Sequence, residues 1–130
     1  MNLVSISVVF PPAWRHGGTP VAAHAVAKAL IHAGHSVKAI VTGCAADGIL
    51  KLGKWTEWDG VPVIYCHKAP IRYLSYAPSL SSTVRQAVRD CDAALIRSIW
   101  QHTGPTAARV CHTMSLPYVA YPEGAFDPWG

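Results

Sequence analysis

The chain has 130 residues, a length that fits one domain with a sizeable core. Only 14% of its residues are charged, whereas about 25% is usual for a soluble domain. We therefore expect either a sheet with large buried faces or a molecular surface that another domain or protein covers. The net charge of +4 comes from scattered Lys and Arg residues, which argues against a nucleic-acid-binding protein. No apolar run approaches the ~20 residues that a membrane span needs.

The first half of the chain reads as strand, helix, strand. Residues 3–10 (LVSISVVF) are β-prone and apolar on both faces, as a buried parallel strand is. A loop with two prolines and two adjacent glycines follows, and then a helix that Thr19 caps and Gly34 ends. The apolar stripe of that helix is predicted to consist of Val21, Ala25, Val26, Ala29, Leu30 and Ile31. Residues 36–42 (SVKAIVT) predict the second strand.

The second half continues the alternation. Residues 44–60 hold Trp55 and Trp58 in a Gly-rich setting and predict a small hairpin or an irregular flap. Strands are then predicted at residues 61–66, 93–96 and 116–121, and helices at residues 81–89 and 105–114. Strands that alternate with helices predict an α/β fold, a Rossmann-like parallel sheet of about five strands with helices on both faces. Ligands of such sheets bind at the carboxyl ends of the strands, near the topological switch point.

Gly17 and Gly18 lie between the first strand and the first helix. Glycine lets a ligand approach the backbone, and the N-terminus of the following helix suits a phosphate. The pattern is not G-x-G-x-x-G, however, and residues 36–44 contain no acid, so the sequence disfavours an NAD site. A turn that merely needs positive φ explains the two glycines equally well.

Cysteine and histidine spacing gives no indication of a metal site. The four cysteines are Cys44, Cys66, Cys91 and Cys111. No C-x-x-C pair exists, so reduced, buried thiols are expected rather than a zinc knuckle or a thioredoxin-like site. His32 and His35 are three residues apart, but Gly34 lies between them and ends the helix, so they do not share a helical face.

Four stretches, in this order, carry a resemblance to a known family. They are RHGGTPVAAHAVAKALIHAGHSVKAIVTG, DGVPVIYCHKAP, CDAALIRSIWQHTGPTAARV and LPYVAYPEGAFDPWG. They resemble the Gly-Gly loop with its G-H-x-V turn, the D-G-V turn, the D-V-V-H-x-H-G-x-W stretch and the P-Y-V-x-x-P-x-G-x-x-D-P-W stretch of glycosyltransferase family 4, of the GT-B fold. The resemblance implies a retaining transferase of polysaccharide biosynthesis, which moves a sugar from a nucleotide-sugar donor to a glycan or lipid-linked acceptor, without a cofactor or a metal.

The resemblance also implies how the protein is organised. Residues 1–130 would be a single N-terminal, acceptor-side domain, and the C-terminal nucleotide-binding domain with its E-x7-E motif would be absent from the chain. The isolated chain is therefore expected to be inactive. Its expected partners are the nucleotide-sugar donor, the acceptor and the missing domain, and not nucleic acid. The expected location is the cytoplasm, with peripheral contact to the inner membrane left open.

The site candidates follow from the matched stretches. They are Glu123 for catalysis, Gly17 and Gly18 for the donor phosphate, and His16, Arg97 and Trp100 for the acceptor, with no metal ligand. Glu123 stands where many relatives have His or Arg; its carboxylate could accept a hydrogen bond or act as a base, or be a solvated loop acid. Arg97, which departs from the family's His-x-His pattern, could contact an anion or cap its strand, and Trp100 could stack on a sugar or pack.

Two other classes of protein stay open. The first is a non-catalytic sugar- or phosphate-binding or interaction domain with the same fold. The second is a receiver-type signalling domain, which is disfavoured because residues 10–18 and 65–69 contain none of the acids that such a domain needs.

Overall fold

The computed structural model describes residues 1–7, 18–42, 53–66, 79–97 and 103–120, with the side chains of residues 18–21 excepted. The elements, in chain order, are β1 (Asn2–Ser7), α1 (Gly18–His32), β2 (Ser36–Val41), β3 (Trp55–Trp58), β4 (Val61–Tyr65), α2 (Leu80–Val88), β5 (Ala93–Ile96), α3 (Thr103–Thr113) and β6 (Tyr118–Ala120).

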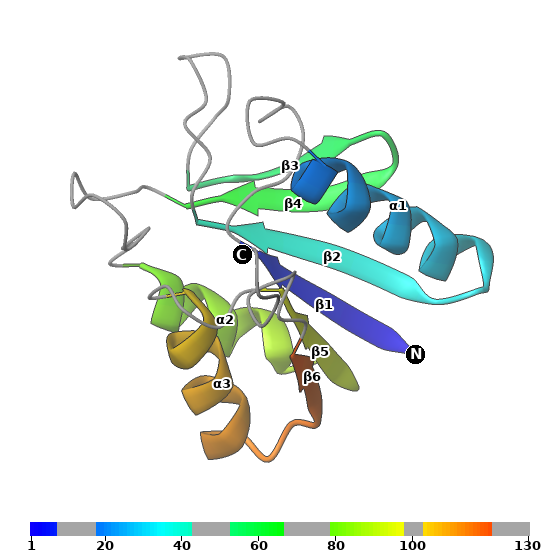
Figure 1. Ribbon diagram of the computed structural model, residues 1–130. Helices are drawn as coiled ribbons and strands as arrows, with labels where there is room; N and C mark the ends of the chain where they lie inside the picture. The colour runs from blue at the N-terminus through cyan, green and yellow to red at the C-terminus, as the bar shows by residue number, and fades with distance from the viewer. Residues whose placement is uncertain (8–17, 43–52, 67–78, 98–102, 121–130) are drawn as a thin grey trace, which may run out of the picture.

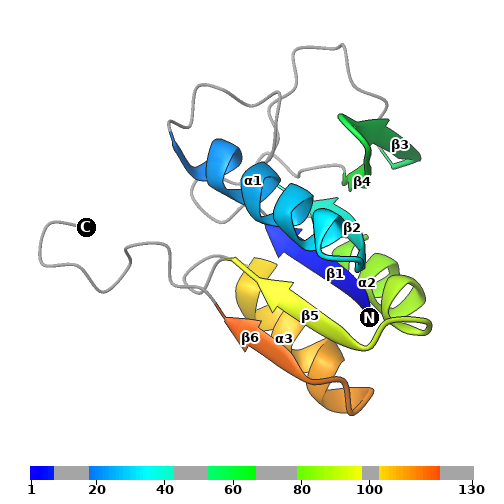
Figure 2. The same cartoon turned by 90° about the vertical axis from the view of Figure 1, so that its right-hand side faces the viewer.

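The six strands form one sheet in the order β3-β4-β2-β1-β5-β6 (Figure 1). Five of them are parallel, and β3 alone is antiparallel, to its neighbour β4. These five are the strands that the sequence predicts, and helices lie on both faces of the sheet (Figures 1 and 2). The predicted Rossmann-like α/β fold is therefore confirmed, with β3 added at one edge.

The core consists of two layers, one on each face of the sheet. On the α1 face, Ala23 and Ala27 of the helix pack against strand residues that include Leu3 and Val63. On the α2/α3 face, residues of both helices pack against a row of isoleucines that crosses the sheet. The row runs through neighbouring register positions: Ile64, Ile40, Ile6 and Ile96. β-branched side chains fit the pleated surface of a sheet well, and this row is the centre of the fold.

Two details of α1 differ from the sequence prediction. Thr19, expected to cap the helix from outside, lies within it, because α1 begins at Gly18. Ala25 and Ala29, expected in the apolar stripe, are exposed, whereas Ala23 and Ala27 are buried. The helix carries alanine and other apolar residues around most of its circumference, so periodicity alone does not select the face that meets the sheet.

A two-residue turn joins β3 to β4 and closes the predicted hairpin. Asp59 (φ 47°) and Gly60 (φ 83°) both have positive φ, as the type I′ turn of a short hairpin requires. Asp59 is fixed from α1: His24 Nε2 lies 3.1 Å from its carboxylate, and Lys28 Nζ donates to its main-chain oxygen at 3.0 Å. The turn thus fastens the β3 edge of the sheet to the helix.

Three of the four cysteines lie in the described residues, and all three are free thiols. Cys66 and Cys111 are buried and Cys91 is half-buried, while Cys44 lies outside the described residues. Burial raises the pKa of the Cys66 thiol, against smaller lowering contributions from hydrogen bonds with Ser79 and Thr83. Burial likewise raises the pKa of the Cys111 thiol.

Alkylation of Cys66 by iodoacetamide at neutral pH is expected to be at least about tenfold slower in the folded protein than in urea. A raised pKa leaves less thiolate at any given pH, and burial also excludes the reagent. Peptide mass spectrometry after timed quenching measures the rate for each cysteine. Equal rates at Cys66 in the folded and unfolded chains would contradict the burial of this thiol.

Within the described ranges, no helix has both the length and the apolar character needed to cross a membrane.

Candidate functional site

The parallel strands end at one edge of the sheet, here called the carboxyl edge. The strand order reverses at β1: the crossover from β1 to β2 runs through α1 on one face, and the crossover from β4 to β5 runs through α2 on the other. The topological switch point therefore lies between β1 and β5. In sheets of this kind ligands bind in the crevice outside the carboxyl ends of the strands at that point.

Buried polar side chains gather at the carboxyl edge. The buried polar or charged residues of the described chain are Ser5, Ser7, Thr42, Arg97 and Thr103. All of these except Ser5 lie at the last residue of a strand, directly after one, or at the start of α3. Burying a polar group is unfavourable unless it finds partners. Most of the buried polar groups of the described sheet therefore lie at the carboxyl edge, where proteins of this fold class bind their ligands.

Two hydroxyls connect β2 to α3 across this edge. The Oγ1 atoms of Thr42 and Thr103 are 2.5 Å apart, with either residue able to donate, and both side chains are fully buried. The main-chain N–H of Thr42 donates to the carbonyl of Ser7 at 3.1 Å, which continues the β1–β2 ladder to the edge. The first turn of α3 is therefore held against the ends of β1 and β2.

Arg97 directly follows β5 and lies beside the switch point. Its main-chain N–H donates to the carbonyl of Ile6 on β1 at 2.9 Å, and the residue is only 8% exposed. A guanidinium keeps its charge at every ordinary pH. The fold therefore places a permanent cation at the carboxyl edge.

The N-termini of α1 and α3 add positive potential at the same edge. A helix that follows a parallel strand begins at the carboxyl edge, so Gly18 at the start of α1 lies there, and Thr103 starts α3 beside Thr42. The first N–H groups of a helix have no partner within the helix, and its dipole favours an anion. Together with Arg97, these helix ends make the edge suited to negative charge.

The sequence-predicted site is only partly within the described residues. Arg97 and the backbone of Gly18 are described and lie at the carboxyl edge. The remaining candidates, His16, Gly17, Trp100 and Glu123, lie outside the described residues. Sequence analysis missed Thr42 and Thr103. The sequence does contain a signal for Thr42, which is a hydroxyl residue at the end of the apolar run SVKAIVT.

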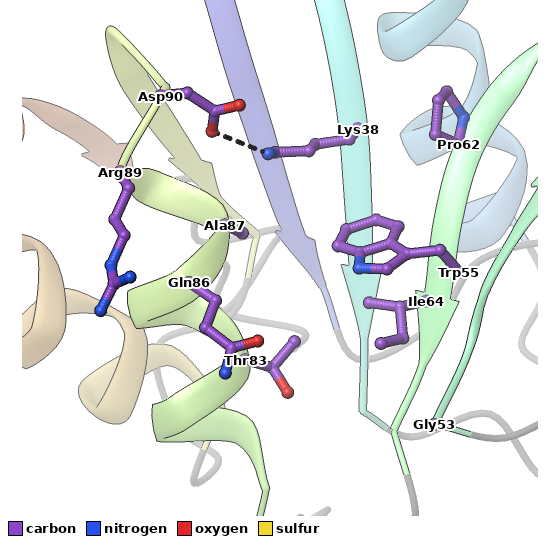
Figure 3. Close-up of a pocket in the computed structure, with 10 residues that line it drawn as sticks. All are labelled: Lys38, Gly53, Trp55, Pro62, Ile64, Thr83, Gln86, Ala87, Arg89 and Asp90. Atoms are coloured by element: carbon purple, nitrogen blue, oxygen red, sulfur yellow. Dashed lines mark hydrogen bonds and ion pairs between the residues drawn. The ribbon is translucent and has the colours of Figure 1, made fainter.

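A separate groove of about 660 Å³ opens on the α2/α3 face, between α2 and the strands β2, β4 and β3 (Figure 3). Trp55 and Lys38 line it from the sheet, and Gln86 and Asp90 from the helix side. Lys38 Nζ lies 3.1 Å from the Asp90 carboxylate. Hydrogen bonding and charge attraction from that ammonium lower the pKa of Asp90, so its carboxylate is ionised at neutral pH. Within the part of the chain that is described, no group of three His, Cys, Asp or Glu side chains could hold a metal ion.

Comparisons with known proteins support the fold and no more. No family model and no curated protein matches the chain. Among solved structures, the chain is similar to the C-terminal domain (residues 78–226) of PF1911 hydrogenase from Pyrococcus furiosus. The identity is 13% and the TM-score 0.58, and the match covers 92% of this chain and 90% of that one. The likeness shows a shared α/β fold.

These findings contradict the resemblance to glycosyltransferase family 4, which is wrong. The similar structure is a domain of a hydrogenase-related protein, and no family model matches the chain. Two assignments rested on that resemblance and are wrong with it. They are the assignment of the chain as a retaining glycosyltransferase and its assignment as half of a GT-B fold. Two of the matched motifs serve turns of the fold itself: Gly34 follows α1 with positive φ, and Asp59-Gly60 forms the turn from β3 to β4.

Proposed function

We propose that this domain binds a phosphate-bearing small molecule at the carboxyl edge of its sheet. The observation that carries the proposal is the position of Arg97, a buried permanent cation directly after β5 and beside the switch point, at the same edge of the sheet where the hydroxyls of Ser7, Thr42 and Thr103 are buried. The proposal keeps the binding-domain alternative of the sequence analysis and needs no transferase chemistry.

The donor set favours phosphate over other anions. A guanidinium offers a planar fork of N–H groups that matches two phosphate oxygens. The N-termini of α1 and α3 supply further N–H donors at the same edge of the sheet. A tetrahedral group with several acceptor oxygens can use donors from several elements, whereas a planar carboxylate uses fewer of them. A sugar phosphate or a nucleotide carries such a group.

Arg97→Lys is expected to weaken the binding of inorganic pyrophosphate about tenfold, since lysine keeps the charge and loses the bidentate fork. Isothermal titration calorimetry of the full chain measures the affinity, and thermal unfolding checks that the variant folds. The matched control is Arg109→Lys, an exposed arginine on α3. Absence of pyrophosphate binding, or an equal loss in both variants, would refute the site.

We further propose that the protein works in a reducing compartment such as the cytoplasm. The free thiols of Cys66, Cys91 and Cys111 favour this location, because such compartments keep thiols reduced. Expression of the full-length gene with a tagged product, followed by cell fractionation and detection of the tag, tests this location.

A further inference from the structure

The groove on the α2/α3 face has two chemically different walls (Figure 3). The sheet wall is mainly apolar: Trp55 of β3 stands beside Ile64, its register partner on β4, with Pro62 further along β4. Trp55 is 47% exposed, so much of its surface is open to a ligand. An exposed indole supplies a large, rigid stacking surface.

The helix wall is polar. Thr83 and Gln86 lie three residues apart on α2, and Asp90 follows the end of that helix, so their side chains line one side of the groove (Figure 3). Lys38 reaches across from β2 and donates to the Asp90 carboxylate at 3.1 Å. The same Nζ lies 5.9 Å from the centre of the Trp55 ring. A donor and an acceptor thus stand side by side, next to the aromatic surface.

We propose that this groove binds an uncharged sugar ring, a pyranoside, which stacks on Trp55 and exchanges hydrogen bonds with Lys38 and Asp90. A pyranose has an apolar face of C–H groups and a rim of hydroxyls that both donate and accept, which matches one apolar and one polar wall. Neighbouring hydroxyls can pair with the ammonium and the carboxylate together.

Other small ligands fit the groove less well. A phosphate would meet the ionised carboxylate of Asp90 beside the Lys38 ammonium, while Arg89, the other cation of the lining, extends away from the sheet (Figure 3). A planar aromatic ligand could stack on Trp55 but offers few hydroxyls to the polar wall. Arg97, Ser7, Thr42 and Thr103 do not line the groove, so this proposal does not depend on the function proposed above.

An NMR titration of the full chain with methyl glucopyranoside, methyl mannopyranoside and methyl galactopyranoside tests the proposal. At least one of them is expected to shift the amide signals of Gly53, Trp55 and Gln86. Trp55→Ala is expected to weaken that binding about tenfold through loss of the buried apolar contact, and Trp55→Phe less. Asp90→Asn should also weaken it.

Trp58→Phe is the matched control. Trp58 belongs to the same strand but packs against the α1-face cluster, on the other side of the sheet. Thermal unfolding establishes that each variant is folded. The proposal is overturned if no pyranoside shifts the signals up to about 0.1 M, if Trp58→Phe weakens binding as much as Trp55→Ala, or if adenosine binds at the groove while the pyranosides do not.

Discussion

Replacing Ile6 with alanine is expected to lower the free energy of unfolding by about 4 kcal/mol. Ile6 is fully buried in the central strand, and its register partners Ile40 and Ile96 continue the isoleucine row on both sides. The helices α2 and α3 pack on this row, so the surroundings have little freedom to close over the space left by the lost methyl groups. Urea denaturation followed by circular dichroism measures the change.

The control for this prediction is Ile6→Val, which removes one methylene group and is expected to cost about 1 kcal/mol. Valine keeps the β-branched shape that suits a strand. If alanine cost no more than valine, the α2/α3 face would not form a close-packed core around Ile6.

The parallel core of the fold could be predicted from the sequence because each buried strand is a compact apolar run. Residues 36–42 and 61–66 are of this kind, and the structure has strands there. β3 could be foreseen only as a hairpin or flap, because Trp55, Thr56 and Glu57 are all exposed and show no alternation. Its strand state depends on pairing with β4 and on the Asp59-Gly60 turn.

The candidate site could be predicted only where it follows directly from a strand. Arg97 comes immediately after the apolar run AALI, so its place at the carboxyl edge is a consequence of the predicted strand. The partnership of Thr42 and Thr103 spans 61 residues, and that of Lys38 and Asp90 spans 52. Such pairs are determined by the packing of helices on the sheet, which no local pattern records.

The family assignment failed for a related physical reason. Short motifs at the turns of a Rossmann-like sheet reflect backbone requirements, such as the positive φ of Gly34 and Gly60, that many unrelated proteins of this fold share. Function depends on the side chains that the fold brings together from distant segments. At the carboxyl edge those are Arg97 and the buried hydroxyls of Ser7, Thr42 and Thr103.

Thr103→Val is expected to lower the free energy of unfolding by about 2 kcal/mol, because it leaves the buried Thr42 hydroxyl without its partner at the start of α3. Thr42→Val should cost a similar amount. The double variant replaces both hydroxyls by methyl groups of the same shape and should cost clearly less than the sum of the single changes. A double-mutant cycle by urea denaturation measures this coupling, and strictly additive costs would contradict the hydrogen bond.

The same cycle separates structure from ligand binding. If the two hydroxyls only hold α3 against β2, the double variant should bind pyrophosphate as the natural protein does once its stability is recovered. If Thr103 also donates to the ligand, as the proposed function expects of the carboxyl edge, affinity should fall in Thr103→Val and stay low in the double variant. Stability would then recover while binding does not, because valine can fill the space of threonine but cannot donate a hydrogen bond.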